Sequence, residues 1–157
     1  MKILLIILAL LHCSAALAEQ APEPVGASQN DVMNDLAIYA MSLSDTPYQY
    51  GGNTSADGFD CSGFVRYVFS NALSLQLPRT SHEMSRIGAH LEPDQLRPGD
   101  LVFYNTRKQR YSHVGIYVGD DRFVHASSSG KSIALVNMQD TYWRTRYNGA
   151  RRVSVNP

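Results

Sequence analysis

Cysteine is scarce in this chain of 157 residues, which contains only Cys13 and Cys61. Two cysteines allow at most one disulfide, so a disulfide-stapled scaffold is excluded and stability must come from a hydrophobic core. A charge excess of one sign is also lacking, because 14 Lys and Arg residues balance 14 Asp and Glu residues. This balance gives no reason to expect nucleic acid or an anionic membrane as a partner.

The chain also lacks an apolar run that could cross a bilayer as a helix, which needs about 20 residues. Its one unbroken apolar stretch, Ile3 to Leu11, is shorter than this. It follows Lys2 and precedes Ala16-Leu17-Ala18, a combination typical of a signal peptide over residues 1–18. We therefore expect an exported protein, either periplasmic or secreted and associated with the cell wall, with no transmembrane segment after cleavage.

Cleavage after Ala18 removes both Lys2 and Cys13. The rest has 13 Lys and Arg residues against 14 Asp and Glu residues, a formal charge of −1 (13 − 14). A lipoprotein leader that ends before Cys13 is the alternative. The bulky His12 disfavours this alternative, because such leaders carry a small residue directly before the cysteine.

The remaining chain is divided by its composition into a linker and one domain. Residues 19–30 contain Pro22, Pro24 and Gly26 with few apolar side chains, which indicates a flexible linker. Residues 31–157 have a length that suits a single domain, and no internal repeat or second module is visible.

Helical periodicity comes first in this domain and strand patterns follow. One helix is predicted over residues 31–43 with Asn30 as N-cap, another from Cys61 to Ala72 with Asp60 as N-cap, and a short one over 82–88. Short segments rich in β-branched and aromatic residues predict strands over 100–104, 113–118, 122–127, 133–137 and 151–155. This order predicts an α+β domain with N-terminal helices packed on a central antiparallel sheet of about five to six strands.

Cys61 lies in the first turn of the second predicted helix, on its apolar face. A thiol there is close to unpaired backbone N–H groups and to the positive end of the helix dipole, so we expect a lowered pKa and a thiolate nucleophile. The backbone N–H groups of Cys61 and Ser62 are candidate donors to an oxyanion. The alternative is that Cys61 is a small buried core residue.

Two histidines, His113 and His125, lie in successive predicted strands. If Gly119-Asp120-Asp121 is a three-residue hairpin loop, Val118 pairs with the first residue of the second strand. His113 and His125 then become diagonal neighbours on one side of the sheet, and Gly115 leaves space for their contact. A different loop length would change this register.

One cysteine followed by histidines is the arrangement expected of a cysteine hydrolase. We expect Cys61 as nucleophile, His113 as general base and acid, and His125 as the orienting residue, with a thiolate–imidazolium pair at rest. One alternative is that both histidines are ordinary strand residues. Another is a zinc site, but the close ligand spacing of typical zinc sites is missing, so no metal or cofactor is expected.

Six ordered segments carry a resemblance to a known family. They are 47–52 (PYQYGG), 58–65 (GFDCSGFV), 77–81 (LPRTS), 97–103 (RPGDLVF), 113–119 (HVGIYVG) and 123–127 (FVHAS). Over residues 31–155 the chain resembles the NlpC/P60 family of cell-wall peptidases, within the papain-like cysteine peptidases. The tail, residues 142–153, is similar to the Spr-type (MepS-like) murein DD/DL-endopeptidases.

The resemblance implies the papain-like NlpC/P60 fold and a catalytic role for the cysteine and both histidines. It makes Tyr50 a candidate active-site hydroxyl, and Asp60 and Ser81 candidates for lining the substrate groove. Tyr50 is also interpretable as a packing residue, and Asp60 as a helix cap alone.

The reaction implied by the resemblance is hydrolysis of peptide bonds in peptidoglycan stem peptides or crosslinks, usually between D-glutamate and a diamino acid such as diaminopimelate. Because the chain carries no wall-binding module, its partner beyond peptidoglycan would be a protein adaptor or none. The alternatives are an amidase or an acyl or peptidyl transferase on the same fold. A non-enzymatic wall-binding module is a further alternative.

Overall fold

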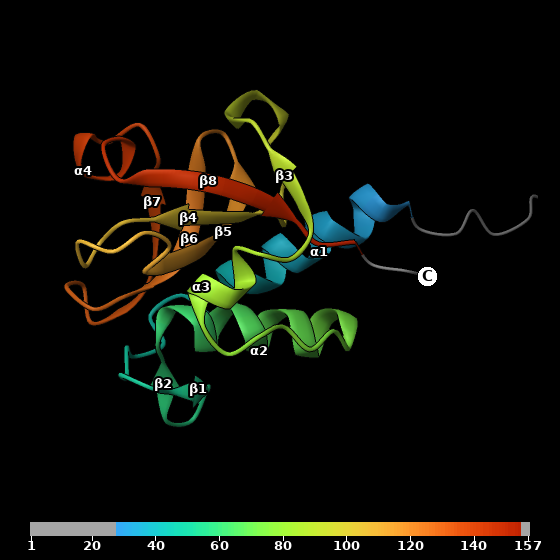
Figure 1. Ribbon diagram of the computed structural model, residues 1–157. Coiled ribbons are helices and arrows are strands. Elements are labelled where there is room, and N and C mark those ends of the chain that lie inside the picture. The colour runs from blue at the N-terminus through green and yellow to red at the C-terminus, as the bar shows by residue number, and fades with distance from the viewer. Residues whose placement is uncertain (1–27, 155–157) are drawn as a thin grey trace, which may run out of the picture.

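Two helices pack against one face of a six-stranded antiparallel sheet in the computed structural model of this protein, which describes residues 28–154 (Figure 1). The predicted signal peptide, residues 1–18, and all but the end of the predicted linker lie outside the described residues. Between residues 28 and 154, no helix is both long enough and apolar enough to cross a membrane. The predicted α+β class, with N-terminal helices on a central antiparallel sheet, is confirmed.

The first helix, α1 (Gln29–Ser42), begins two residues earlier than predicted. Its N-cap is Ser28 and not Asn30, because Ser28 and Asp31 form a capping box. The Asp31 N–H donates to Oγ of Ser28 at 3.3 Å, and the Ser28 N–H donates to the Asp31 carboxylate at 3.1 Å. The pair satisfies two backbone donors at the helix start and places Asn30 inside the first turn.

The second helix, α2 (Cys61–Leu73), begins at the predicted residue, with Asp60 as its N-cap. Oδ1 of Asp60 accepts the Gly63 backbone N–H at 2.7 Å. The third helix, α3 (Ser81–Met84), is shorter than the helix predicted over 82–88.

The main sheet has the strand order β3-β8-β4-β5-β6-β7, and all neighbouring strands are antiparallel. Its strands are β3 (Ala89–Leu91), β4 (Leu101–Tyr104), β5 (His113–Gly119), β6 (Arg122–Ser127), β7 (Ser132–Asn137) and β8 (Tyr147–Arg152). The smaller elements are β1 (Asn53–Thr54) and β2 (Gly58–Phe59), which form a separate sheet, the 3-10 helix η1 (Pro93–Gln95) and α4 (Thr141–Arg144). Because β1, β2 and β3 are only two or three residues long, their sequences carry no strand pattern.

The last strand, β8, differs from its prediction over residues 151–155 because it begins at Tyr147 and ends at Arg152. The Asn148-Gly149 pair is typical of a turn, yet it lies inside β8, where Gly149 pairs with Phe103 of β4 and Asn148 is an extra residue without a partner in β4. A register shift between Phe103 and Tyr104 accommodates it, and Gly149 adopts a φ of 119°. Pairing of the flanking residues Tyr147 and Ala150 with β4 therefore outweighs the local turn preference.

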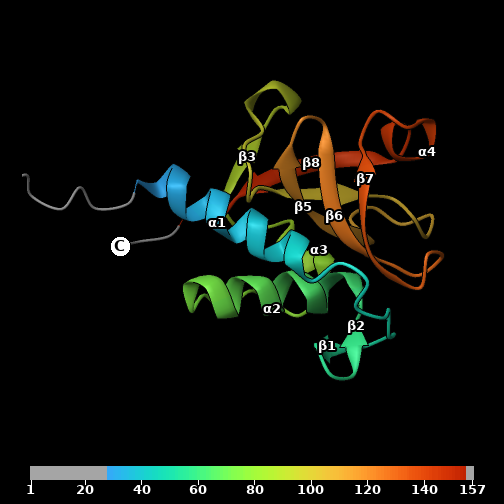
Figure 2. The same cartoon turned by 180° about the vertical axis from the view of Figure 1, so that it is seen from behind.

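Apolar side chains cover both faces of the main sheet. The face under α1 and α2 (Figure 2) contributes buried residues from four strands: Leu101, Phe103, Val114, Ile116, Val124, Ala126 and Ile133. The opposite face forms a second cluster that includes Val102, Tyr104, Tyr117, Phe123 and Ala150, and Trp143 of α4 packs against this cluster. The alternation of side chains along each strand produces this division.

The β5–β6 hairpin has a two-residue loop, not the predicted three-residue loop. Asp120 and Asp121 both have positive φ, 50° and 55°, as a primed hairpin turn requires. Gly119 pairs with Arg122, so the predicted pairing of Val118 with Arg122 is wrong, and Val118 forms an extra residue in β5. The bulge restores the predicted register beyond it, because Tyr117 pairs with Phe123.

Candidate active site

The predicted nucleophile and all four predicted supporting residues line one surface pocket of about 300 Å³. Its lining residues are Tyr50, Gly51, Asp60, Cys61, Ser62, Arg79, Thr80, Ser81, Arg107 and Ser112. A larger groove of about 590 Å³ runs between α1 and α2, but no cysteine or histidine lines it. The first pocket is therefore the candidate active site.

Close backbone packing fixes Cys61 at the start of α2. The Gly52 carbonyl accepts the Asp60 N–H at 3.0 Å. The same carbonyl approaches Gly63 so closely that a Cβ at Gly63 would clash with it. The glycine pair of the preceding loop thus packs directly on the first turn of α2, which leaves the partly buried Cys61 at the pocket.

Burial raises the pKa of the Cys61 thiol, and the negative charge of Asp60 adds to the rise. Backbone N–H groups of Val114 and Ser62, and the positive charge of Arg107, oppose it less strongly. The predicted lowering of this pKa is therefore wrong. The physical reason is first the burial of the thiol, which disfavours the charged form, and second the Asp60 carboxylate, which places a like charge beside a thiolate.

The two predicted histidines form a buried pair. Nε2 of His113 lies 2.9 Å from Nδ1 of His125, and the rings are nearly perpendicular, at 82°. The predicted contact between them is confirmed. Gly115 does not leave empty space, however, because the ring of Phe123 fills it: a Cβ at Gly115 would lie 2.5 Å from Phe123 Cδ2.

Burial also controls the charge of the histidine pair. It lowers the pKa of His113 well below its usual range, and the charges of His125 and Arg107 lower it further. Burial lowers the pKa of His125 to about 4. Both rings are therefore neutral near pH 7.

The thiol lies near the start of β5, because the backbone N–H of Val114, the residue after His113, is close enough to lower the pKa of Cys61. Among residues 28–154, no hydrogen bond joins the Cys61 sulfur to the His113 ring. A raised thiol pKa and a lowered imidazole pKa both favour neutral groups. The free site therefore holds a thiol and an imidazole, and the predicted thiolate–imidazolium pair at rest is not supported.

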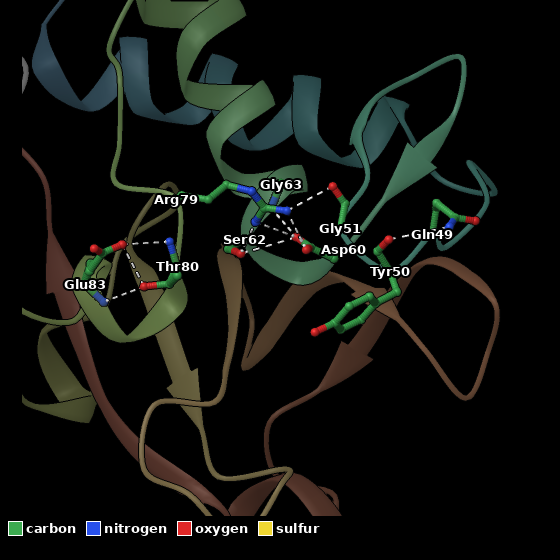
Figure 3. Close-up of polar contacts among 9 residues, drawn as sticks. All are labelled: Gln49, Tyr50, Gly51, Asp60, Ser62, Gly63, Arg79, Thr80 and Glu83. Atoms are coloured by element: carbon green, nitrogen blue, oxygen red, sulfur yellow. Dashed lines mark hydrogen bonds and ion pairs between the residues drawn. The ribbon is translucent and has the colours of Figure 1, made fainter.

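Asp60 has a second function besides capping α2, because it binds Arg79 (Figure 3). The Arg79 guanidinium donates to Oδ2 of Asp60 at 2.7 Å and to Oδ1 at 3.2 Å. It also donates to Oγ of Ser62 at 2.9 Å and to the Gly51 carbonyl at 3.0 Å. This network joins the glycine loop, the start of α2 and the segment before α3. Sequence reasoning missed Arg79, although its segment is among those that carry the resemblance.

Tyr50 and Ser81 lie at opposite extremes of exposure in the same pocket. Tyr50 is 73% exposed, and its hydroxyl takes part in none of the polar contacts drawn in Figure 3. Ser81 is buried, and its hydroxyl donates to the Tyr111 carbonyl at 2.7 Å. Of the two, only Tyr50 presents its side chain to solvent at the pocket.

Sequence reasoning also missed Trp143, which covers the histidine pair. Its ring stacks on His113 with centroids 5.7 Å apart, and meets His125 edge-on at 4.8 Å. The available signal was the tail motif, whose Trp143 follows an exposed Tyr142. Nothing in the sequence pattern says that this segment returns to the sheet beside β5 and β6.

The described part of the chain, residues 28–154, has no cluster of three or more His, Cys, Asp or Glu side chains that could hold a metal ion.

Residues 45–152 match the sequence profile of the NlpC/P60 family. The chain is 43% identical over 107 residues to "Gamma-DL-glutamyl hydrolase" of Bacillus subtilis. It is 43% identical over 106 residues to "Murein DD-endopeptidase MepS/Murein LD-carboxypeptidase" of Escherichia coli. Each alignment covers 68% of this chain, and they cover 26% and 55% of the two relatives, so the chain spans about half their length or less.

A solved structure, an NlpC/P60 family protein from Bacillus cereus, shares the fold with a TM-score of 0.70 at 30% identity. The match covers 80% of this chain and 42% of the other. Profile and fold thus agree with the resemblance inferred from the six segments. The chain belongs to the NlpC/P60 family.

Proposed function

We propose that this chain is a cysteine peptidase that hydrolyses peptide bonds in peptidoglycan. The observation that carries the proposal is the position of Cys61, at the pocket, at a helix start and close to Val114. Val114 directly follows His113 in β5, and His113 forms a buried pair with His125. Family membership supports the same reaction class. The relatives named above are a glutamyl hydrolase and a murein endopeptidase.

In the proposed mechanism, His113 accepts the thiol proton as Cys61 attacks the scissile carbonyl. A general base is required because the thiol is neutral in the free site. The backbone N–H groups of Cys61 and Ser62 are the proposed donors to the oxyanion. His113 then protonates the leaving amine, and afterwards deprotonates the water that hydrolyses the thioester.

His125 orients His113 in this mechanism. The 2.9 Å contact occupies Nε2 of His113, which leaves Nδ1 as the ring atom available to the thiol proton. Asp60 and Ser81 support the pocket wall through hydrogen bonds, and Tyr50 is a side chain that substrate can contact.

We further propose that the substrate bond joins D-glutamate to diaminopimelate in a stem peptide. The relative named as a glutamyl hydrolase supports this bond, whereas the murein DD-endopeptidase supports a crosslink as second candidate. Export to the periplasm or cell wall is proposed from the signal-peptide pattern of residues 1–18.

Digestion of defined muropeptides tests the bond assignment, with fragments identified by mass spectrometry. Cleavage beside D-glutamate releases a peptide with a new amino terminus on diaminopimelate. Crosslink cleavage instead converts a dimer to two monomers, and amidase action separates the whole stem from the sugar. A transferase would join fragments without adding water. A digest that contains only intact starting material would leave a wall-binding module as the better interpretation.

A further inference from the structure

The candidate active site carries an excess of positive charge. Its lining residues include two arginines, Arg79 and Arg107, and one carboxylate, Asp60, a formal charge of +1 (2 − 1). Asp60 and Arg79 neutralise each other at 2.7 Å. The charge that remains at the pocket is the guanidinium of Arg107.

Arg107 has no acidic partner among residues 28–154, where no carboxylate oxygen lies within 4.0 Å of its guanidinium. Its side chain is exposed, but its position is defined. The backbone N–H groups of Thr106 and Arg107 both donate to Oγ of Ser112, at 3.0 and 3.2 Å, and Ser112 itself lines the pocket. These two hydrogen bonds join the two ends of the loop between β4 and β5 beside the pocket.

The guanidinium of Arg107 lies over the ring of Tyr50, 5.7 Å from its centroid. Stacking on an aromatic face orients the planar group, and no carboxylate among residues 28–154 occupies its N–H donors. The positive charge of Arg107 also acts on Cys61 and His113. It lowers the pKa of both groups, although burial has the larger effect on each. An oriented cation without a partner, close to the nucleophile, is suited to an anionic ligand.

We propose that Arg107 is a specificity-determining residue whose guanidinium binds a carboxylate of the stem peptide close to the bond that Cys61 attacks. This inference rests on the proposed function. Arg79 does not serve this purpose, because Asp60, Ser62 and Gly51 already occupy its donors. In a γ-linked D-glutamyl bond the α-carboxylate is free, and diaminopimelate brings a further carboxylate on the other side, so two sources share this chemistry.

The test measures kcat and KM for three stem peptides with the native protein. One peptide has all carboxylates free, one has a carboxamide on the α-carbon of D-glutamate, and one has a carboxamide on diaminopimelate. We expect one of the two amidated peptides to lose roughly ten- to hundredfold in kcat/KM, the range of a charge-assisted hydrogen bond. The amidated peptide with the lower kcat/KM identifies which carboxylate Arg107 binds.

The variant Arg107→Gln should lower kcat/KM for the free-carboxylate peptide by a similar factor, mainly through KM, and leave the sensitive amidated peptide unchanged. The matched control is Arg110→Gln in the same loop, because Arg110 lies on Tyr111 outside the pocket lining. It should change neither substrate.

Three results would overturn the inference. If the native protein cleaves all three peptides equally well, Arg107 binds no substrate carboxylate, although the peptidase proposal stands. An equal loss in Arg107→Gln on free and amidated peptides would mean that Arg107 acts on the thiol or the histidine instead. If the native protein cleaves none of the peptides, the proposed function itself fails, and this inference fails with it.

Discussion

Nε2 of His113 and Nδ1 of His125 lie 2.9 Å apart, beneath the ring of Trp143. One of the two neutral rings must donate a proton to the other. If the donor is Nε2 of His113, its Nδ1 carries the lone pair that a general base needs. The contact therefore fixes the orientation of the proposed base, and donation from its Nε2 is the tautomer that the mechanism requires.

Replacing His125 should lower kcat more than it changes KM. His125→Ala removes the partner of Nε2 and should lower kcat by roughly 100-fold, the scale of a misplaced catalytic group. His125→Asn retains a side chain that can accept from Nε2, so it should recover a large part of the loss. Steady-state kinetics on a muropeptide measures both. Equal activity of the alanine and asparagine variants would contradict the orienting role.

The histidine pair should also make the protein less stable in acid. The pKa of His125 is about 4 in the folded state against an ordinary 6.5, so the unfolded state binds more protons between these values. The free energy of unfolding therefore rises with pH through this window, and falls on acidification by up to about 3 kcal/mol from His125 alone.

Denaturant unfolding at several pH values between 4 and 7 measures this effect. His125→Asn should flatten the pH dependence in that range, although the lowered pKa of His113 leaves a slope of the same sign. An unaltered slope in the variant would show that other groups cause the acid sensitivity.

The Cys61 thiol should react slowly with alkylating agents at neutral pH. Burial raises its pKa, and the thiolate is the reactive form. In the chain from Glu19 onward Cys61 is the single cysteine, so iodoacetamide labelling followed by intact mass spectrometry reports on it alone. The rate should lie below that of a free peptide thiol at pH 7 and increase above pH 9. A fast, pH-independent rate down to pH 6 would indicate a resting thiolate instead.

Trp143 should control the acid limb of activity by keeping water from the histidine pair. Burial is the dominant cause of the lowered pKa of His113, and the charges of His125 and Arg107 add to it. Trp143→Ala exposes the His113 ring to water, which should raise the pKa of His113. The acid limb of the kcat/KM profile should then move up by about one pH unit. Trp143→Phe keeps an apolar cover and should keep the native limb. If both variants lose activity and the acid limb of their kcat/KM profiles stays at the native pH, Trp143 has only a structural effect.

Short-range signals were sufficient to predict the elements that hold the site. The cap at Asp60, the start of α2 and the strand with His125 follow from residues that are adjacent in sequence. The histidine contact was also predictable, because strand alternation fixes which side chains share a face. The wrong pairing predicted at Val118 does not affect the histidines. The bulge at Val118 returns the strands to the predicted register at Tyr117, which pairs with Phe123.

What the sequence did not reveal depends on contacts between distant segments. Trp143 lies 30 residues after His113 in the sequence, and only the return of the chain through β8 brings α4 to the histidine pair. The pKa of Cys61 was mispredicted because helix position alone favours the thiolate, whereas burial and the Asp60 carboxylate outweigh it. The helical pattern did place Cys61 on an apolar face, but the extent of its burial depends on how the packed fold covers that face.

Hydrolysis of purified muropeptides by the native protein and by Cys61→Ala tests the central claim most directly. The alanine variant keeps the volume of a small side chain at the helix start, so circular dichroism and melting should match the native protein. We expect the native protein to release peptide fragments and the variant to release none above background. Fragment release by a folded Cys61→Ala protein at the native rate would contradict the nucleophile assignment.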